Sequence, residues 1–562
     1  MKKGILGLML MSFTCITIKG QTNVSGFISA NTTWDLNGSP YIVIGNALLS
    51  HGYTLTINPG VVVKFNDSCA LQIDGEMDAI GTPQNHITFT SNQINPHAGD
   101  WAKIHFSDTC VSAVFDSLGN YVSGCIMKYC DVMYGGGIGF GEIHIESSSP
   151  YISHCNISNS SAAGIYCDGS SYLLDSSNVN HCAGYGLYFL NQSLNSTVLN
   201  IIGDTIENNT GGINFATYNV NFHTSICNNV FISNNGLAVI YFESDLYTNV
   251  RISGNDFINN DANGVIRVNE SLFTDTIECN KFIHNQTTLG CISTTGGSSG
   301  VIVNNTFNSN NSTGDAVIRV YCSDGQNLIF ANNYLAYNTA THSICEFTPV
   351  LVNTPYLQID SNVFDKNIAA SIVRLDGYVT NTGDLNFLYM KFNDFNDTTQ
   401  IEVYNNIPYG SPDIYADSNY WGTTNTTYIN SAIYDYFQYA NLSVVYYSPP
   451  LSFAVEIDTS CAPNIVITGI KPINEQKNSS VLLYPNPFST STTLIINGVE
   501  TPLMASLQLK IYDVYGQEVR NIYVGTNKQI TINREELASG MYFYQLVNNT
   551  KEVVATGKMV IN

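Results

Sequence analysis

The sequence predicts an all-β protein: a right-handed parallel β-helix solenoid followed by a small C-terminal β-sandwich. Three observations predict this fold: a motif that recurs in steps of 22 to 31 residues, short segments of alternating apolar and polar residues, and a change of composition near residue 481. Repeat periods of 20 to 50 residues are typical of solenoids, propellers and arrays.

The repeated motif has an asparagine, an apolar residue two positions later and a second asparagine three positions after that, as in residues 255–260. In successive repeats, the apolar position is occupied by Val132, Ile157, Val179, Ile206, Phe231, Phe257, Phe282, Phe307, Leu335, Phe364, Phe395 and Trp421. Five residues earlier the chain has Ile152, Leu174, Ile201, Ile226, Ile252, Ile277, Ile302, Phe330, Ile359 and Met390. Each repeat is thus expected to stack the same kind of side chain on that of its neighbour.

The two asparagine positions form columns in the same register. One column contains Asn229, Asn255, Asn280, Asn305, Asn333, Asn362, Asn393 and Asn419, and the other contains Asn209, Asn234, Asn260, Asn285, Asn310, Asn338 and Asn367. Asparagine tolerates the left-handed backbone of tight turns. Stacked amides also form hydrogen-bonded ladders. Both properties predict turns at these positions.

Between these turns lie short segments that alternate apolar and polar residues, such as residues 264–268 and 316–320. Their period of two and their length predict strands rather than helices. A unit of two or three such strands buries its apolar face only when units stack, about 4.8 Å apart. This favours a parallel β-helix, and the crossover rule makes it right-handed. Leucine-rich repeats and propellers fit less well, because a helical segment and antiparallel hairpins are missing.

The N-terminus has the pattern of a secretory signal peptide over residues 1–20. Lys2 and Lys3 precede an apolar stretch over residues 4–18. No later apolar run reaches the roughly 18 residues of a spanning helix, so we expect no transmembrane segment in the mature chain. Residues 21–480 contain 12 basic and 38 acidic residues, a net charge of −26. Nucleic acid is therefore excluded as a partner, since phosphate binding needs a basic patch.

Removal of the signal leaves 13 of the 14 cysteines, an odd number. They are scattered and include no CxxC pair, which gives no support for a structural zinc site. We expect them mainly as small apolar core residues rather than as a disulfide framework. The pairing of individual cysteines stays open.

The first part of the chain resembles the N-terminal region of secreted β-helix proteins of the pectate-lyase-like superfamily. The resemblance is carried over residues 34–106 by Trp34 and by SPYIV (39–43), TLTINPGVVVKF (54–65), LQIDG (71–75), GT (81–82), ITFTS (87–91) and GDW (99–101). It implies a capping region and first coils over residues 21–110 and further coils over 111–451. It specifies architecture but no activity.

The excess of acidic residues ends at residue 481, because residues 481–562 contain six basic and six acidic residues. The motifs YPNP (484–487), DVYG (513–516), LASGMYFY (537–544) and GKMVIN (557–562) follow in order, with strands expected near 493–497 and 507–512. This tail resembles the type A sorting domain of the type IX secretion system, found on Bacteroidetes cargo. The resemblance implies export by that machinery, to the medium or the outer cell surface. Residues 452–480 are expected to be a linker.

The strand after each second asparagine should present a column of outward side chains, on which ligands of a β-helix would bind. The residues singled out there are Tyr166, Tyr188, Tyr241, Arg267, Arg319 and Arg374. Tyrosine rings stack on sugars, and arginine forks hold carboxylates or sulfates. The alternative is a solvated face whose arginines only offset nearby acids such as Glu346 and Asp376.

Catalysis has little support in the sequence. A calcium-dependent lyase needs carboxylates that converge from adjacent coils, whereas Glu243 has Ala216 and Asn269 as column neighbours. Tyr241, Glu243 and Arg267 form the best conceivable catalytic cluster. The motifs of polygalacturonase-type hydrolases are missing, and seven histidines from His105 to His342 are dispersed along the chain. We therefore expect no cofactor or metal. Calcium would be a ligand only if the protein were a lyase.

Three functional hypotheses follow. The first is an exported passenger that binds glycans or acts in adhesion without catalysis. The second is a polysaccharide lyase or glycoside hydrolase acting on an acidic polysaccharide. The third is a structural surface protein.

Overall fold

The structure is a computed structural model of the full chain. It describes residues 20–454, except 117–118, 170–172, 192–196, 218–221, 245–247, 270–272, 296–297, 323–326, 352–356, 380–387, 397–400 and 410–412, and parts of residues 480–561. The chain divides into two compact units, Met1–Ile465 and Val466–Asn562. The division falls inside the expected linker, most of which lies outside the described residues. Residues 1–19 of the predicted signal peptide also lie outside them.

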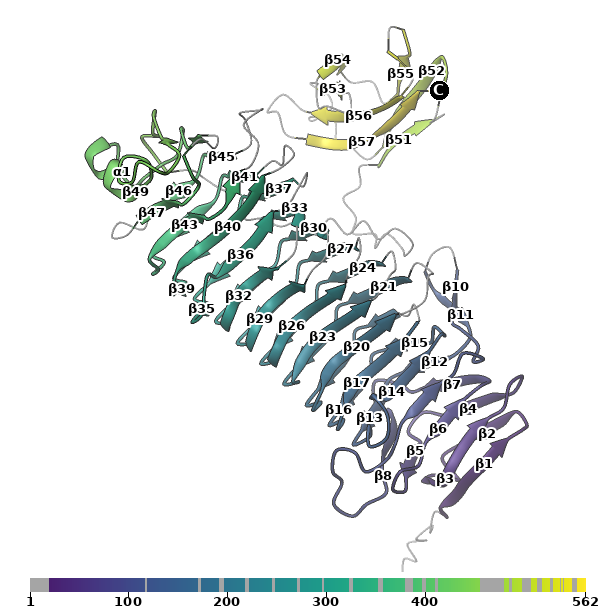
Figure 1. The fold of residues 1–562 in the computed structure, drawn as a ribbon. Helices are drawn as coiled ribbons and strands as arrows, with labels where there is room; N and C mark the ends of the chain where they lie inside the picture. Colours follow the sequence, from purple (N-terminus) through teal and green to yellow (C-terminus); the bar gives the residue numbers. More distant parts are fainter. Residues whose placement is uncertain are drawn as a thin grey trace, which may run out of the picture. The chain divides into compact units, whose positions relative to one another are not determined.

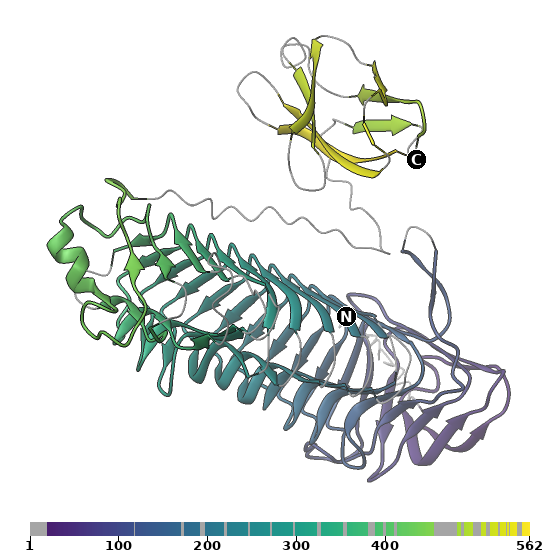
Figure 2. The ribbon, with the colours of Figure 1, turned by 45° about the horizontal axis from the view of Figure 1, so that its top comes forward.

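The first unit is the predicted parallel β-helix, in which three ladders of parallel strands run along the stacked coils (Figures 1 and 2). One ladder runs from β2 (Thr32–Trp34) to β50 (Val445–Tyr446), and a second from β5 (Val62–Phe65) to β46 (Asp394–Phe395). The third ladder includes β9 (Ile104–Phe106), β14 (Gly141–Glu146), β17 (Ala163–Asp168), β20 (Tyr185–Asn191), β23 (Gly211–Thr217), β26 (Asn235–Ser244), β29 (Asp261–Asn269), β32 (Gln286–Thr294), β36 (Ile318–Cys322), β40 (Ser343–Leu351), β43 (Ser371–Leu375) and β47 (Ile401–Asn405).

The interior consists of the predicted stacks. In the first ladder, the aliphatic line from Ile152 to Met390 pairs residue by residue in the predicted order. In the second ladder, the rings of Phe257 and Phe282 stack with their centroids 4.9 Å apart. Phe395 and Trp421 close this stack at 4.8 Å. Because all these side chains are buried, the repeat pattern has its origin in one continuous core.

The asparagine columns form the predicted amide ladders. Asn280 accepts hydrogen bonds at Oδ1 from the backbone N and the Nδ2 of Asn255, and its own Nδ2 donates to Asn305 Oδ1 and to the carbonyl of Ile252. Every polar atom of this buried amide is thereby satisfied. The left-handed backbone of these turns does not fall on the asparagines themselves. The residue just before each of them adopts it instead, and its type varies: before Asn280 and Asn285 it is Cys279 and His284.

The ends of the β-helix differ from its middle. The chain starts with the edge strand β1 (Thr22–Ile28), which pairs with β3 (Tyr41–Leu49) in parallel. A hairpin of β10 (Val114–Phe115) and β11 (Tyr121–Ser123) interrupts the early coils. The last coils carry the short helix α1 (Thr426–Ala432), which the sequence did not predict, at the end opposite β1 (Figure 1). Asn425 caps this helix by accepting a hydrogen bond from the backbone N of Thr427.

The second unit has the two antiparallel sheets of the predicted sandwich. One contains β51 (Ser480–Tyr484), β52 (Ser491–Asn497) and β55 (Gln529–Asn533). The other contains β53 (Leu507–Tyr512), β54 (Glu518–Gly525), β56 (Gly540–Val547) and β57 (Val553–Ile561). Apolar side chains of both sheets form a common core. The motifs at 485–487 and 513–516 lie outside the described residues.

The cysteines mostly occupy the core, as expected. Among the described residues, the free thiols are those of Cys69, Cys110, Cys125, Cys130, Cys155, Cys167, Cys182, Cys227, Cys291, Cys322 and Cys345, and all are buried. Cys279 is disulfide-bonded. Small apolar side chains rather than a framework of bridges therefore account for most of them.

Candidate functional site

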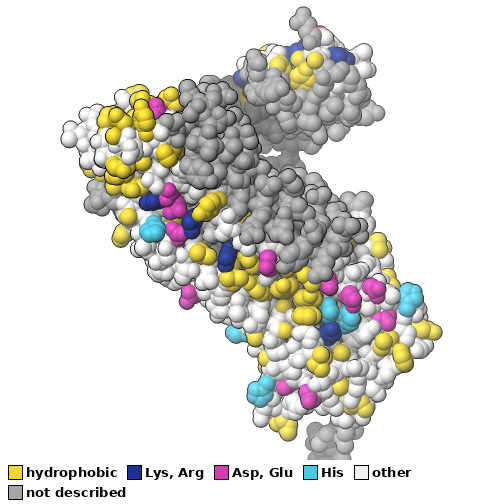
Figure 3. All heavy atoms as spheres, viewed as in Figure 1, with side chains coloured by type: hydrophobic (Ala, Val, Ile, Leu, Met, Phe, Trp, Pro, Cys, Tyr) yellow, Lys and Arg dark blue, Asp and Glu magenta, His cyan; other side chains and the backbone are white. Residues whose placement is uncertain are grey.

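The third ladder presents the outward column of side chains that the sequence predicts. Coil by coil, the paired residues are His105, His144, Tyr166, Tyr188, Asn214, Tyr241, Arg267, Ser293, Arg319, Glu346, Arg374 and Tyr404. We call these residues the outward column. Charged, histidine and hydrophobic side chains gather along this face in Figure 3. The predicted register is confirmed, and the three arginines lie on alternate coils.

The aromatic end of the outward column is more tightly packed than the sequence suggests. The rings of Tyr166 and Tyr188 stack with centroids 5.4 Å apart, and Phe140 stacks on the other side of Tyr166 at 4.8 Å. Tyr166 is consequently only 6% exposed, whereas Phe140 is 65% exposed. The burial raises the pKa of Tyr166 to about 12. Phe140, which the sequence analysis did not single out, is therefore the accessible ring at this end.

The expectation that the histidines are dispersed is wrong for two of them. The rings of His105 and His144 stack in adjacent coils, 4.6 Å apart, and His144 contacts Tyr166 edge-on. Lys103 Nζ lies 2.8 Å from His144 Nδ1. Burial, together with the charge of Lys103, lowers the pKa of His144 to about 3, so this ring is neutral at pH 7. The two histidines extend the aromatic surface of the outward column without adding charge.

Arg267 is the arginine of the outward column without a carboxylate partner in the described part of the chain. Its guanidinium Cζ lies 5.3 Å from the ring centroid of Tyr241, and its buried Nε has no hydrogen-bond partner. Glu243 lies two residues after Tyr241 on the same face of the strand, and the described residues contain no ion pair between it and Arg267. Its column neighbours are Ala216 and Asn269, as predicted. The three residues of the suggested catalytic cluster thus lie near one another, but only one of them is a carboxylate.

Arg319 and Arg374 instead belong to an ion-pair network. Arg319 binds Asp315 and lies 3.4 Å from Glu346 Oε1. Arg374 Nη2 lies 2.8 Å from Asp376 Oδ2, and its Nε lies 4.0 Å from Glu346 Oε2. For these two arginines, the interpretation that they offset nearby acids is correct. Burial still raises the pKa of Glu346, because desolvation outweighs the attraction of the two guanidinium groups.

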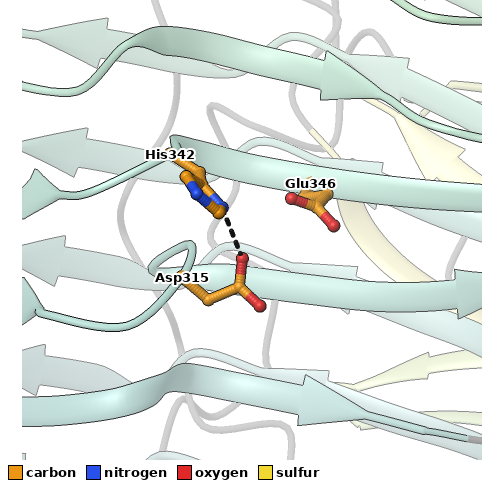
Figure 4. Close-up of side chains that lie close together, drawn as sticks. All are labelled: Asp315, His342 and Glu346. Atoms are coloured by element: carbon orange, nitrogen blue, oxygen red, sulfur yellow. Dashed lines mark hydrogen bonds and ion pairs between the residues drawn. The ribbon is translucent and has the colours of Figure 1, made fainter.

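The same network contains a group of metal-ligand type that the sequence analysis missed. Ligand atoms of Asp315, His342 and Glu346 lie within 4.8 Å of one another, and His342 Nδ1 is 3.2 Å from Asp315 Oδ1 (Figure 4). Carboxylates from adjacent coils therefore do converge here. The guanidinium of Arg319 contacts both carboxylates, and so supplies the positive charge that a bound cation would bring. The residues present fit an internal ion pair better than a metal site.

No helix in the described residues has the length and apolar character needed to cross a membrane.

Several solved structures align with most of the chain at low similarity. The tailspike protein of Pseudomonas phage LKA1 shares 10% identity over 88% of this chain and 89% of its own, with a TM-score of 0.25. A tailspike mutant of E. coli bacteriophage HK620 shares 10% over 92% and 86%, with a TM-score of 0.23. The receptor-binding domain of the Siphovirus 9NA tailspike shares 8% over 92% and 94%, with a TM-score of 0.18. No curated protein matches the chain significantly.

The sequence comparison with protein families identifies the C-terminal unit. Residues 482–562 match the secretion system C-terminal sorting domain. This match confirms the sorting domain of the type IX secretion system that the tail motifs predicted. The protein is therefore exported by that system, to the cell surface or into the medium.

Proposed function

We propose that the exported β-helix binds a glycan carrying carboxylate or sulfate groups, through the outward column and without catalysis. The observation that carries the proposal is the state of Arg267: a half-buried guanidinium, stacked on Tyr241, with no carboxylate in ion-pair distance in the described residues. A planar guanidinium binds a carboxylate or sulfate through two parallel hydrogen bonds. Its packing on Tyr241 fixes the fork in place before a ligand arrives.

The neighbouring residues supply the other contacts that a sugar chain needs. Tyr188 is half-buried and Phe140 is exposed, so both offer ring surface to the apolar face of a sugar. Tyr166 and Tyr241 pack beside these groups and offer little surface of their own, since each is only 6% exposed. In this proposal Arg319 and Arg374 contribute less, because their charge is already balanced by Asp315, Glu346 and Asp376.

The same charge balance supports binding without catalysis. A lyase or hydrolase needs a free carboxylate or base beside the substrate. The converging pair, Asp315 and Glu346, is held by Arg319, and the column neighbours of Glu243 are Ala216 and Asn269, neither of which is a carboxylate.

The test measures binding of the mature protein to a panel of acidic and neutral polysaccharides, for the natural sequence and for two variants. We expect Arg267→Ala to weaken binding to the acidic members at least tenfold. Arg251→Ala is the matched control, because Arg251 has similar exposure but lies in the first ladder and is paired with Glu278. Raising the salt concentration should weaken acidic binding as well.

Four outcomes would overturn the proposal. Equal loss in both variants would indicate a general charge effect, and unchanged binding in Arg267→Ala would remove the outward column as the site. New reducing ends or unsaturated uronide absorbance, in the presence of calcium, would favour a hydrolase or a lyase. Self-association without binding to any polysaccharide would favour a structural surface protein.

A further inference from the structure

The end of the β-helix that carries α1 has a pocket, far along the coils from Arg267. It has a volume of about 340 Å³ and lies between α1, β49 (Ile433–Tyr434) and β50 (Val445–Tyr446). Its lining residues are Asn430, Ile433, Asp435, Phe437, Gln438, Val445 and Tyr447. Hydrophobic side chains gather over this end of the β-helix in Figure 3. Phe437 at the pocket is 76% exposed, which is costly for a phenyl ring in water.

The pocket wall is rigid. Asp435 is 3% exposed, and its two carboxylate oxygens accept hydrogen bonds from the backbone N of Phe437, at 3.0 Å, and of Val445, at 2.8 Å. Gln438 accepts a bond from Asp435 N and donates one to the carbonyl of Asn430. The ring of Phe437 is held edge-on against Tyr436, with centroids 5.7 Å apart. The aromatic surface is therefore fixed before any ligand binds.

The charge of the pocket excludes an anionic ligand. The chain has no lysine, arginine or histidine between Lys391 and Lys471. Asp435, the charged residue of the lining, is 3% exposed and directs both oxygens at backbone donors, so it offers little accessible charge to a cation. The other polar groups of the lining are the exposed amides of Asn430 and Gln438 and the hydroxyl of Tyr447, all of which both donate and accept hydrogen bonds. The ligand that complements this surface is neutral.

The size of the pocket limits the ligand further. At about 340 Å³ it lies at the small end of ligand sites, large enough for one or two sugar rings and too small for a peptide helix. An exposed ring beside an amide matches a hexopyranose, which has an apolar face and a rim of hydroxyl groups. We infer that this pocket binds a neutral hexose unit of a glycan, stacked on Phe437 and hydrogen-bonded to Asn430. This site is independent of the acidic-glycan face.

The test uses calorimetric titration of the mature protein with cellohexaose, maltohexaose, mannohexaose and xylohexaose. We expect at least one hexose oligomer to bind and Phe437→Ala to weaken that binding at least tenfold. Phe27→Ala is the matched control, because Phe27 is 77% exposed near the opposite end of the β-helix. Asn430→Ala, a second surface variant, should also weaken binding.

Two further measurements separate this site from the outward column. Binding of the neutral oligomer should be the same at low and high salt and unaffected by Arg267→Ala. The inference fails if none of the three hexose oligomers binds, if Phe437→Ala binds as well as the natural sequence, or if Arg267→Ala removes the binding; xylohexaose, a pentose oligomer, is the comparison. Whether Arg267→Ala loses binding to acidic glycans tests the proposed function of the outward column and does not bear on this pocket.

Discussion

The guanidinium of Arg267 lies over the ring of Tyr241 in the adjacent coil, with 5.3 Å between Cζ and the ring centroid. Two coils further on, Arg319 faces the same side but is bound to Asp315 and Glu346. One register position therefore contains two kinds of arginine. The first has no carboxylate partner in the described residues, and the second is held by two carboxylates. This difference leads to the first prediction.

Arg319→Ala should destabilise the protein more than Arg267→Ala. The first change leaves two carboxylates of low exposure without their main partner, which costs about 3 kcal/mol of unfolding free energy at pH 7. The second removes only a stacking contact and should cost about 1 kcal/mol or less. Urea unfolding measures both. Because burial raises the pKa of Glu346, this carboxyl should be protonated before an ordinary glutamate as the pH falls. The two variants should then differ less in unfolding free energy at low pH than at pH 7. A larger difference at low pH would contradict the role of the ion pairs.

The interior amide ladder should be sensitive to single changes. Asn280→Ala removes an acceptor from the backbone N of Asn255 and a donor from the carbonyl of Ile252, both in the core. Leaving such groups unsatisfied should lower the unfolding free energy by at least about 2 kcal/mol. The control is Asn263→Ala, at an exposed position. Thermal and urea unfolding measure the loss of unfolding free energy in both variants. An equal loss in Asn280→Ala and Asn263→Ala would show that a ladder asparagine contributes no more than a surface asparagine.

Asp204 occupies an asparagine position of the ladder and should gain stability when replaced by asparagine. Its Oδ1 accepts a hydrogen bond from Ser177 N, while its Oδ2 is buried without a partner. Burial raises its pKa well above the ordinary value. Asp204 therefore makes its full contribution to the stability of the folded protein at pH values below its pKa in the unfolded chain. This contribution is lost as the pH rises through the pKa of Asp204 in the folded protein. Asp204→Asn should therefore stabilise the protein most at high pH, whereas the exposed control Asp261→Asn should not.

Glu142 should make stability fall as the pH rises towards about 8. This carboxyl is fully buried, accepts one hydrogen bond from Gly135 N and leaves its Oε2 unpaired. Burial raises its pKa to about 8. Stability from the neutral acid is complete below the ordinary glutamate pKa and is lost as pH rises through about 8. Unfolding curves between pH 6 and 9 should show this loss in the natural sequence but not in Glu142→Gln, which keeps the bond to Gly135. An identical pH profile in both proteins would contradict the assignment.

The place where sequence analysis failed most clearly is the pair His105 and His144. The two rings stack directly, yet 39 positions separate them and the β10–β11 hairpin lies between. The insertion hides the repeat, so the spacing gave no sign of contact. Asp315 and His342 were missed for a related reason. Both precede the strands of their coils, outside the alternating pattern on which the outward column was predicted.

The sequence alone determined the coils, their register and the exported tail, because each coil repeats the same local pattern and stacking aligns equal positions. The order of the aliphatic line, the amide ladders and the outward column could all be predicted in this way. Only the tertiary structure decided which charges pair, which rings stay exposed and where a pocket forms. Those properties depend on side chains from turns, insertions and the last coils, where the repeat breaks and spacing no longer specifies contact.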